Sequence, residues 1–308
     1  MKKIYSYSIS ILVLITSVNK TIAQTDSTKK VDLFADIDNE AKATTAANID
    51  YATATFKSTR VINSQSIETI GKHNLDFRIS HRFGYLNSGA YNLFGLDNAT
   101  MMMNFDYGLT NNLLVGVGRS TVNKEYSAYA KYKFLKQSTG KVNMPITMAY
   151  LFSAMHYTQK TTEDISFTNR TSYAHQLLIA RKFSDNISLQ LMPTLVHINL
   201  VDFSKEDNNL FSLGVGGRVK ISKRVAINAE YFHQFNQLTG TTNSLSIGFD
   251  IETGGHVFQL HFTNSTGMTE RAFITNTTGD WGNGDIHFGF NISRLFTLKK
   301  SAGSRSSW

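Results

Sequence analysis

Apolar and polar residues alternate with a period of two along most of this chain. In residues 99–108, Met101, Met103 and Phe105 fall on one face, while mostly polar or small residues fall on the other. A Thr-Asn-Asn turn follows, and the alternation resumes in residues 113–120. Two alternating runs joined by a tight turn are typical of a β-hairpin. The sequence therefore predicts antiparallel β-structure.

The same pattern recurs towards the C-terminus and predicts twelve strands. They are expected at residues 72–83, 99–108, 113–120, 125–136, 144–157, 171–183, 187–199, 209–221, 225–235, 243–251, 256–264 and 285–296. About ten residues, each adding about 3.3 Å and tilted by about 45°, span roughly 23 Å, close to the apolar height of a membrane barrel. Strands of this length can therefore cross a bilayer.

The connections between these strands alternate in length. Tight connections are expected at residues 109–112, 184–186, 222–224 and 252–255, and mostly longer ones at 84–98, 158–170, 200–208 and 265–284. Short turns at one end and long loops at the other are typical of outer-membrane barrels. An even number of strands then places both ends of the barrel on the short-turn, periplasmic side. We expect the long loops, 265–284 included, to be accessible to protease from outside the cell.

Alternation alone does not separate a membrane barrel from a secreted sandwich or a lipocalin-like barrel, which has the same pattern turned inside out. Here the polar face also carries many glycines, and aromatic residues cluster near strand ends on the apolar face, as interfacial girdles do. The sequence therefore predicts an all-β fold, a transmembrane antiparallel up-and-down β-barrel of about twelve strands. Because lipid satisfies no backbone hydrogen bonds, the last strand must pair with the first, near residues 75–79.

The ends of the chain carry separate signals. Residues 1–23 read as a cleavable signal peptide, with Lys2 and Lys3 before a short apolar run and Ala23 at a small-residue cleavage site. Residues 24–71 are polar and weakly patterned, and are predicted to be a periplasmic N-terminal extension, either a flexible tail or a plug inside the barrel. The barrel is expected at residues 72–297, followed by a polar C-terminal tail at 298–308.

The composition agrees with export and argues against nucleic acid as a partner. The chain has no cysteine, two prolines, 18% charged residues and 12% aromatic residues. Without cysteine, neither a disulfide framework nor a lipid-anchored lipoprotein is predicted. The formal net charge of +8 is modest and spread along the chain, and no nucleic-acid-binding motif accompanies it. The expected partners are outer-membrane lipid, the barrel assembly machinery during biogenesis and small polar solutes, and not nucleic acid.

Four short stretches resemble a known family: DFRISHRFG at residues 76–84, FGLDNA at 94–99, DYGLTNNL at 106–113 and KYKFLKQ at 131–137. The chain is similar over most of residues 55–296 to signal-peptide-bearing Bacteroidota β-barrel proteins that share a domain of unknown function. The resemblance implies an outer-membrane location and brings no catalytic residues. Outer-membrane barrels commonly end on an aromatic residue, whereas here Phe296 is followed by a polar tail. Either Phe296 or Trp308 is expected to take that role.

Histidines and acidic pairs are the residues that could carry chemistry. By strand parity His261 faces inward, while His175, His197 and His233 face outward, and no histidine has metal-ligand spacing. His233 is the best candidate base for a lipid-facing Ser-His pair, but no serine lies on the same face of the neighbouring strands. The sequence therefore predicts no catalytic residue, no metal and no cofactor, and the protein is not expected to be an enzyme.

Charged residues on the polar face give the strongest functional signal. Buried charges need partners or water, so charges of both signs indicate a hydrated or salt-bridged interior. The predicted pore-lining residues are Asp76, Arg78, Arg82, Asp106, Lys131, Lys133, Lys182, Arg218, Lys220, Glu230 and Asp250. The bases gather towards the short-turn end, which predicts a mild preference for anions if the barrel conducts. In the alternative interpretation, acids of the extension such as Asp32 and Asp36 pair with these bases and close the mouth.

The sequence thus favours an outer-membrane barrel that is a narrow or plugged channel for small polar or anionic solutes. Twelve strands lie between the eight that side chains fill and the sixteen that leave an aqueous pore. The alternative is a non-conducting surface-interaction or structural barrel, and an outer-membrane enzyme comes third. The oligomeric state stays open.

Overall fold

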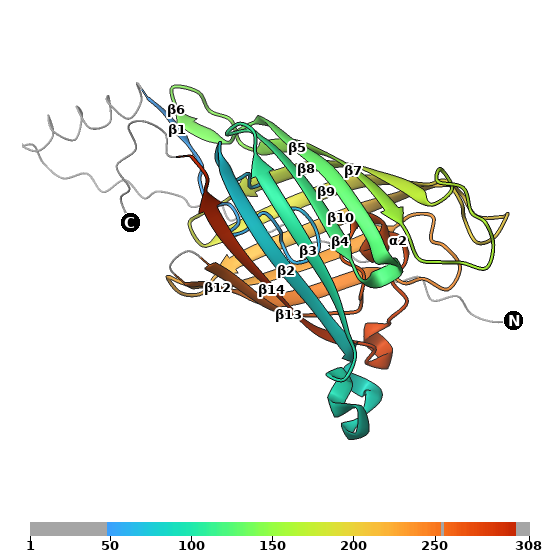
Figure 1. Ribbon diagram of the computed structural model, residues 1–308. Helices are drawn as coiled ribbons and strands as arrows, with labels where there is room; N and C mark the ends of the chain where they lie inside the picture. Colours follow the sequence, from blue (N-terminus) through green and yellow to red (C-terminus); the bar gives the residue numbers. More distant parts are fainter. Residues whose placement is uncertain (1–47, 254–255, 300–308) are drawn as a thin grey trace, which may run out of the picture. The chain divides into compact units, whose positions relative to one another are not determined.

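The computed structural model describes residues 48–253 and 256–299, and the predicted all-β fold is confirmed (Figure 1). Twelve strands form one closed antiparallel barrel. They are β2 (Asn74–Tyr85), β3 (Ala99–Gly108), β4 (Leu113–Ser120), β5 (Glu125–Leu135), β7 (Thr147–Tyr157), β8 (Thr171–Lys182), β9 (Ile187–Ile198), β10 (Asn209–Lys220), β11 (Val225–Gln234), β12 (Ser244–Thr253), β13 (His256–Thr263) and β14 (His287–Thr297). Within the described ranges no helix is long and apolar enough to span a membrane.

The barrel closes between its last and first strands, as predicted. β14 pairs with β2 in antiparallel register, with Ile292 opposite Ile79 and Thr297 opposite Asn74. One irregularity interrupts this ladder between His287 and Gly289. The remaining strands pair with their neighbours in chain order, so the described barrel has no open edge.

A small two-stranded sheet lies beside the barrel. Strand β1 (Ile49–Tyr51) pairs with β6 (Ser138–Gly140), which belongs to the connection between β5 and β7. Because this connection folds back on itself, with Ser138 bridging Met144, β7 begins at Thr147 rather than at residue 144. The signal peptide predicted at residues 1–23, the acids Asp32 and Asp36, and Trp308 lie outside the described residues.

Side chains alternate between the two faces of the barrel wall as their polarity predicts. On β3, Phe105 is 46% exposed on the outer face, while its neighbours Asn104 and Asp106 are buried inside. A wall with apolar side chains outside and polar side chains inside suits lipid on one side only. This orientation excludes the soluble barrel with an apolar interior.

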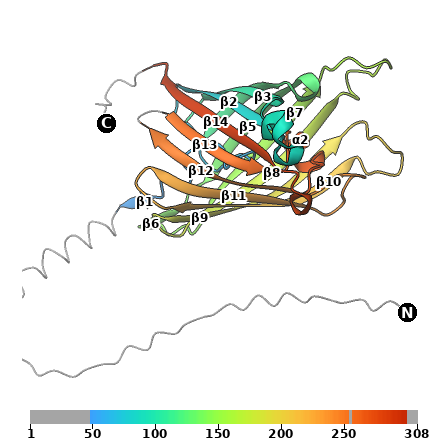
Figure 2. The same cartoon turned by 90° about the horizontal axis from the view of Figure 1, so that it is seen from below.

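The two ends of the barrel differ, and we call them the short-turn end and the long-loop end. Short connections include residues 109–112, 183–186 and 221–224, and the first and last barrel strands also meet at this end. The other end carries the longer loops at residues 86–98, 158–170, 199–208, 235–243 and 264–286, some with short helices. These helices are η1 (Leu86–Ser88), η2 (Ala90–Gly95), α2 (Glu270–Thr275) and η4 (Trp281–Asn283); the tight connection after β4 holds η3 (Val122–Lys124). Both views place β1 and β6 at one end and α2 towards the other (Figures 1 and 2).

The loop at residues 264–286 corrects one prediction. It was expected to be exposed, but much of it is buried, and Phe273 and Ile274 of α2 are fully buried. Their side chains pack in the same apolar cluster as inward residues of β8 to β11, including Leu178, Met192 and Phe232. The loop folds inward because an apolar patch on the otherwise polar inner wall gives α2 a surface to cover.

Candidate functional site in the barrel lumen

Residues 59–66 form a tight hairpin inside the barrel, which we call the luminal hairpin. The amide of Val61 donates to the carbonyl of Ser64 (2.9 Å), and the amide of Ser66 donates to the carbonyl of Thr59 (2.9 Å). Arg60 and Gln65 form a β-bridge between the two arms. Every residue of the hairpin is buried. An unpaired backbone group at such a depth is costly, so the wall of the barrel must supply partners.

Glu230 of β11 holds the tip of the luminal hairpin. Its carboxylate accepts the main-chain amides of Asn63 (2.7 Å), Ser64 (3.1 Å) and Ile62 (3.3 Å). The hydroxyl of Ser64 donates to the same carboxylate at 2.6 Å. Hydrogen bonds to an ionised acceptor are about twice as strong as neutral ones, so this contact offsets much of the cost of burying the charge.

The carbonyls of the luminal hairpin meet amide and amine donors from four other strands. Gln259 of β13 donates to Val61 (3.0 Å) and Asn291 of β14 donates to Ile62 (3.0 Å). Two further donors reach the second arm, Gln190 of β9 to the carbonyl of Gln65 (2.8 Å) and Lys131 of β5 to that of Ser66 (2.8 Å). The barrel wall thus surrounds the hairpin with polar contacts.

Two arginines of β2 bind side chains of the hairpin. Arg78 donates to the hydroxyl of Thr59 (2.6 Å), which in turn donates to Asp106 of β3 (3.0 Å). Arg82 donates to the side-chain oxygen of Asn63 at 2.6 Å. These contacts compensate buried charges of the wall with groups of the hairpin.

The inward-folded loop meets the luminal hairpin from the long-loop end. Glu270 of α2 forms a buried ion pair with Arg60 (3.4 Å), whose guanidinium also lies over the ring of Tyr129. The ring of Phe273 meets that of Phe232 edge-on at 5.1 Å. Since Phe273 shares its apolar cluster with Val61 of the hairpin, the two segments form one packed unit inside the barrel.

The eleven predicted pore-lining residues all lie on the inner face of the wall. Eight are buried: Asp76, Arg78, Arg82, Asp106, Lys131, Arg218, Glu230 and Asp250. The other three are partly exposed near the short-turn end: Lys133, Lys182 and Lys220. The structure brings most of the buried eight into the contacts around the luminal hairpin. That these residues line a conducting path stays a prediction.

Acidic partners meet the basic residues at the short-turn end. Lys133 lies 3.6 Å from Glu68, which follows the luminal hairpin in the chain, and Lys182 lies 2.9 Å from Asp185. Lys182 also donates to the carbonyl of Thr53 (3.2 Å). The segment before β2 therefore reduces the positive charge at this mouth.

Several residues at the centre of the site were missed in the sequence. Gln190, Gln259 and Asn291 are uncharged, so their alternation marked them only as inward-facing polar positions. The luminal hairpin lies where the alternation typical of strands is weak. Its one sequence signal is the Asn63-Ser64 pair, two residue types that favour turns, between Val61-Ile62 and Gln65-Ser66. Glu270 was missed because its loop was expected to be exposed.

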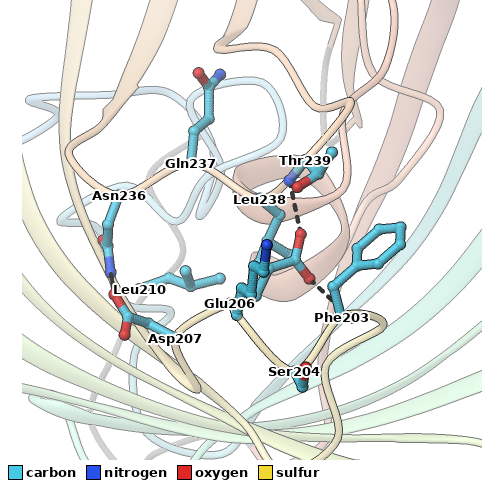
Figure 3. A pocket seen from close by; sticks show the side chains of 10 residues that line it. Phe203, Ser204, Glu206, Asp207, Leu210, Asn236, Gln237, Leu238 and Thr239 are labelled. Atoms are coloured by element: carbon cyan, nitrogen blue, oxygen red, sulfur yellow. Dashed lines mark hydrogen bonds between the residues drawn. The ribbon is translucent and has the colours of Figure 1, made fainter.

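A hollow lies at the long-loop end, between residues 199–208 and 235–243. Its volume is about 460 Å³. Figure 3 shows Glu206 directed towards the main chain of two residues, and its carboxylate accepts the amides of Thr239 (2.8 Å) and Phe203 (3.4 Å). The bond from Thr239 holds the pKa of Glu206 below its usual range. Glu206 therefore links the two loops. Within the described ranges no group of His, Asp or Glu side chains is arranged to hold a metal ion.

Comparison with known proteins gives a match in sequence and a likeness in fold. A family profile described as membrane bound beta barrel domain (DUF5777) matches residues 56–296. No curated protein sequence matches the chain.

Among solved structures, the outer membrane channel from Pseudomonas putida F1 is 13% identical, with a TM-score of 0.47, covering 75% of this chain and 98% of its own. The KdgM porin is 11% identical, with a TM-score of 0.44 and coverage of 72% and 99%. The outer membrane protein Omp33 of Acinetobacter baumannii is 9% identical, with a TM-score of 0.41 and coverage of 75% and 100%.

Proposed function

The chain belongs to the membrane bound beta barrel domain family (DUF5777), and on this premise we propose that it is an outer-membrane channel for small polar or anionic solutes, plugged by its own luminal hairpin. Residues 1–23 would direct its export, and residues 24–71 would form the periplasmic extension that carries the plug. Membrane lipid and the barrel assembly machinery are the other partners of this proposal.

One observation carries the proposal: polar groups of the inner wall are paired with a separate segment of chain. Glu230, Arg82 and Lys131 each bind the luminal hairpin rather than a charged residue of a neighbouring strand. A barrel that is only structural could satisfy such groups across its own wall. If the luminal hairpin leaves the barrel, the polar side chains of the inner wall that it binds become hydrated. A channel for polar solutes requires such a hydrated, polar inner wall.

The chain leads out of the lumen at the short-turn end. After the luminal hairpin it passes Thr69, whose hydroxyl donates to the carbonyl of Asn111 (3.0 Å), and Lys72, whose amide donates to the side chain of Asn111 (3.0 Å). Asn111 lies in the tight connection between β3 and β4. We propose that the hairpin withdraws towards the short-turn end, where this attachment would keep it near the mouth.

Conductance of the purified full-length protein in planar bilayers tests the proposal. Glu230→Gln keeps the shape of the side chain but replaces the charged acceptor of three amides. Because hydrogen bonds to charged groups contribute about 1.5–3 kcal/mol each, losing one favours the unplugged state by about tenfold or more. We expect more frequent opening in the variant than in the unchanged protein.

The matched control is Glu163→Gln, which removes a carboxylate from an exposed loop. It should leave the opening frequency unchanged. If neither the unchanged protein nor Glu230→Gln conducts, although both insert as folded barrels, the channel proposal is wrong.

The second candidate is a non-conducting barrel that binds a partner through its loops. The hollow beside Glu206 favours it, because two loops there are held together around a concave surface. If the Glu230→Gln variant shows no conductance in planar bilayers, this second candidate is supported. An enzyme remains third. Within the described ranges the ring of His233, the candidate base, meets the ring of Phe235 edge-on at 5.2 Å and forms no hydrogen bond to a serine.

A further inference from the structure

We propose that the inner wall of the barrel is a binding site for the main chain of short peptides, and that the luminal hairpin occupies this site in the resting protein. The inference rests on the proposed channel function, and it names peptides as the class of solute that the lumen recognises.

The wall forms hydrogen bonds to both the side chains and the backbone of the luminal hairpin, and those to the backbone are the more numerous. Side chains from five strands, β5, β9, β11, β13 and β14, bind its main-chain atoms. Glu230 accepts three consecutive amides, and four donors bind the carbonyls on both arms. Gln259 reaches two of these carbonyls, those of Val61 (3.0 Å) and Arg60 (3.4 Å). These contacts would be available to a peptide of different sequence.

The type of group on the wall also matches a peptide better than an ion or a sugar. A simple ion needs several groups of one sign, whereas the groups that bind the hairpin are of three kinds. They are the Glu230 carboxylate, the basic groups of Arg82 and Lys131, and the neutral amides of Gln259 and Asn291. A sugar presents hydroxyls, which donate and accept at the same atom. A peptide presents separate donors and acceptors, and the wall supplies an acceptor for the amides and donors for the carbonyls.

Apolar side chains of a peptide also have a place. Val61 packs near Gly216, where a Cβ would lie 3.5 Å from its methyl groups, and it belongs to the same apolar cluster as Met192. Methionine is flexible and fills gaps of irregular shape, so this wall can adapt to other apolar side chains. The site therefore combines fixed contacts for the main chain with an adaptable apolar patch.

Beyond the luminal hairpin, the inner wall carries further buried polar atoms that no group in the described part of the chain satisfies. Within the described ranges, Arg218 Nε, both side-chain polar atoms of Asn228, and Asp250 Oδ2 are buried without a hydrogen-bond partner. Arg218 is opposite Asn228 in the β10–β11 register, and Asp250 is opposite Ala226, two residues along β11. They form a patch between Glu230 and the short-turn end. Natural proteins rarely leave such groups unsatisfied, so the patch extends the site for a ligand longer than the hairpin.

Binding of a synthetic peptide tests the inference. The probe is the capped octapeptide TRVINSQS, the sequence of residues 59–66, carrying fluorescein at its N-terminus. The receptor is full-length protein with Val61→Asp, which places a carboxylate in the apolar cluster and displaces the hairpin. Phe56→Asp disturbs the same cluster and serves as a second receptor if the first does not fold. Fluorescence anisotropy should show saturable binding to the variant and at least tenfold weaker binding to the unchanged protein.

Two modified peptides separate main-chain from side-chain recognition. One is N-methylated at the three amides that Glu230 accepts, and it should lose binding. The other has alanine in place of Gln65, whose side chain accepts one hydrogen bond from Lys131 (3.1 Å), and it should bind about tenfold more weakly, the effect of roughly one hydrogen bond to a charged group. If the N-methylated peptide binds as well as the original, or the alanine peptide does not bind, main-chain recognition is wrong.

Variants of the wall provide the matched comparison. Gln259→Met removes the hydrogen bonds to two carbonyls of the hairpin, and we expect peptide binding about five- to twenty-fivefold weaker for one to two lost hydrogen bonds. Gln234→Met removes a buried inner amide that bonds to the carbonyl of Thr242 (3.1 Å) and not to the hairpin, and it should leave binding unchanged. Equal effects of the two substitutions would overturn the proposed site.

The bilayer measurement distinguishes failure of this inference from failure of the proposed function. Added peptide should reduce the conductance of Val61→Asp. A variant that conducts but binds no peptide in the anisotropy assay leaves the channel intact and refutes the peptide site. A variant that binds peptide but does not conduct refutes the channel instead.

Discussion

A glycine lies opposite some of the largest inward-facing rings of the barrel. Gly116 is opposite Tyr129 in the β4–β5 register, and Gly214 is opposite Phe232 in the β10–β11 register. A Cβ added at either glycine would overlap the ring of its partner. Small residues on the inner face are therefore part of the packing of the interior, and they do not mark open space.

Gly116→Ala should destabilise the folded barrel by about 1–3 kcal/mol, the usual effect of overpacking a filled interior. Urea unfolding of the protein in lipid vesicles measures the change. Gly216→Ala is the matched control. Its Cβ would meet only the flexible end of the Met192 side chain at 3.3 Å and the methyl groups of Val61 at 3.5 Å. Equal stability of both variants with the unchanged protein would show that Tyr129 does not fill the space beside Gly116.

Phe105→Arg should destabilise the inserted barrel by about 2–4 kcal/mol, because its side chain faces lipid towards the middle of β3. The same unfolding experiment in vesicles measures this effect. Phe167→Arg is the control, since Phe167 is exposed in the loop at residues 158–170 and does not belong to a strand. A Phe105→Arg barrel as stable as this control would place the outer face of β3 away from lipid.

At the scale of elements, two long loops at the same end behave differently. Residues 158–170 are mostly exposed, whereas residues 264–277 are mostly buried. The second loop contains Phe273 and Ile274, which have an apolar patch to cover inside the barrel. A short buried helix also needs a capped end, and the side chain of Thr269 accepts the amide of Ala272 at the start of α2.

Protease added to intact cells should cut within residues 158–170 and spare both the buried part of loop 264–286 and the turn at 183–186. Exposed loops are the preferred sites of cleavage. Mass spectrometry of the fragments locates the cuts. Glu270→Ala with Phe273→Ala should make loop 264–286 sensitive, because these substitutions remove an ion pair and a ring contact inside the lumen. Cleavage at 183–186 in intact cells would place the short-turn end outside.

At the scale of the whole molecule, the lumen is occupied from both ends. The luminal hairpin enters from the short-turn end, α2 enters from the long-loop end, and they meet at the ion pair between Arg60 and Glu270. Because both segments share one apolar cluster, displacement of either exposes apolar surface of the other. Opening of the barrel is therefore expected to involve both.

The opened barrel should show a mild anion preference. Lys133, Lys182 and Lys220 lie near the short-turn mouth, and partial neutralisation by Glu68 and Asp185 keeps the preference small. The reversal potential of Asn63→Ala in a KCl gradient measures it, since this substitution disturbs the hairpin without changing a charge. Raising the salt should weaken it, because the Debye length is only about 10 Å at 0.1 M.

Charge substitutions identify the source of this preference. Lys182→Glu combined with Lys220→Glu should shift the reversal potential towards cations. Lys205→Glu, in a loop at the opposite end, should shift it far less. Cation preference in Asn63→Ala itself would contradict a basic mouth.

The sequence by itself determined the strands, the faces of the wall and the closure of the barrel. These features follow from the period of two and from the need of every backbone group in lipid for a partner, and both can be read locally. The position of Arg78 or Glu230 on the inner face needed only strand parity.

Only the tertiary structure decided what fills the lumen. Asn63 and Glu230 are 167 residues apart in the chain, and Arg60 and Glu270 are 210 apart. No local pattern joins such residues, because their contact depends on the order and tilt of all the strands between them. The inward turn of loop 264–286 was hidden for the same reason: Phe273 has an apolar partner only once β8 to β11 have closed around it.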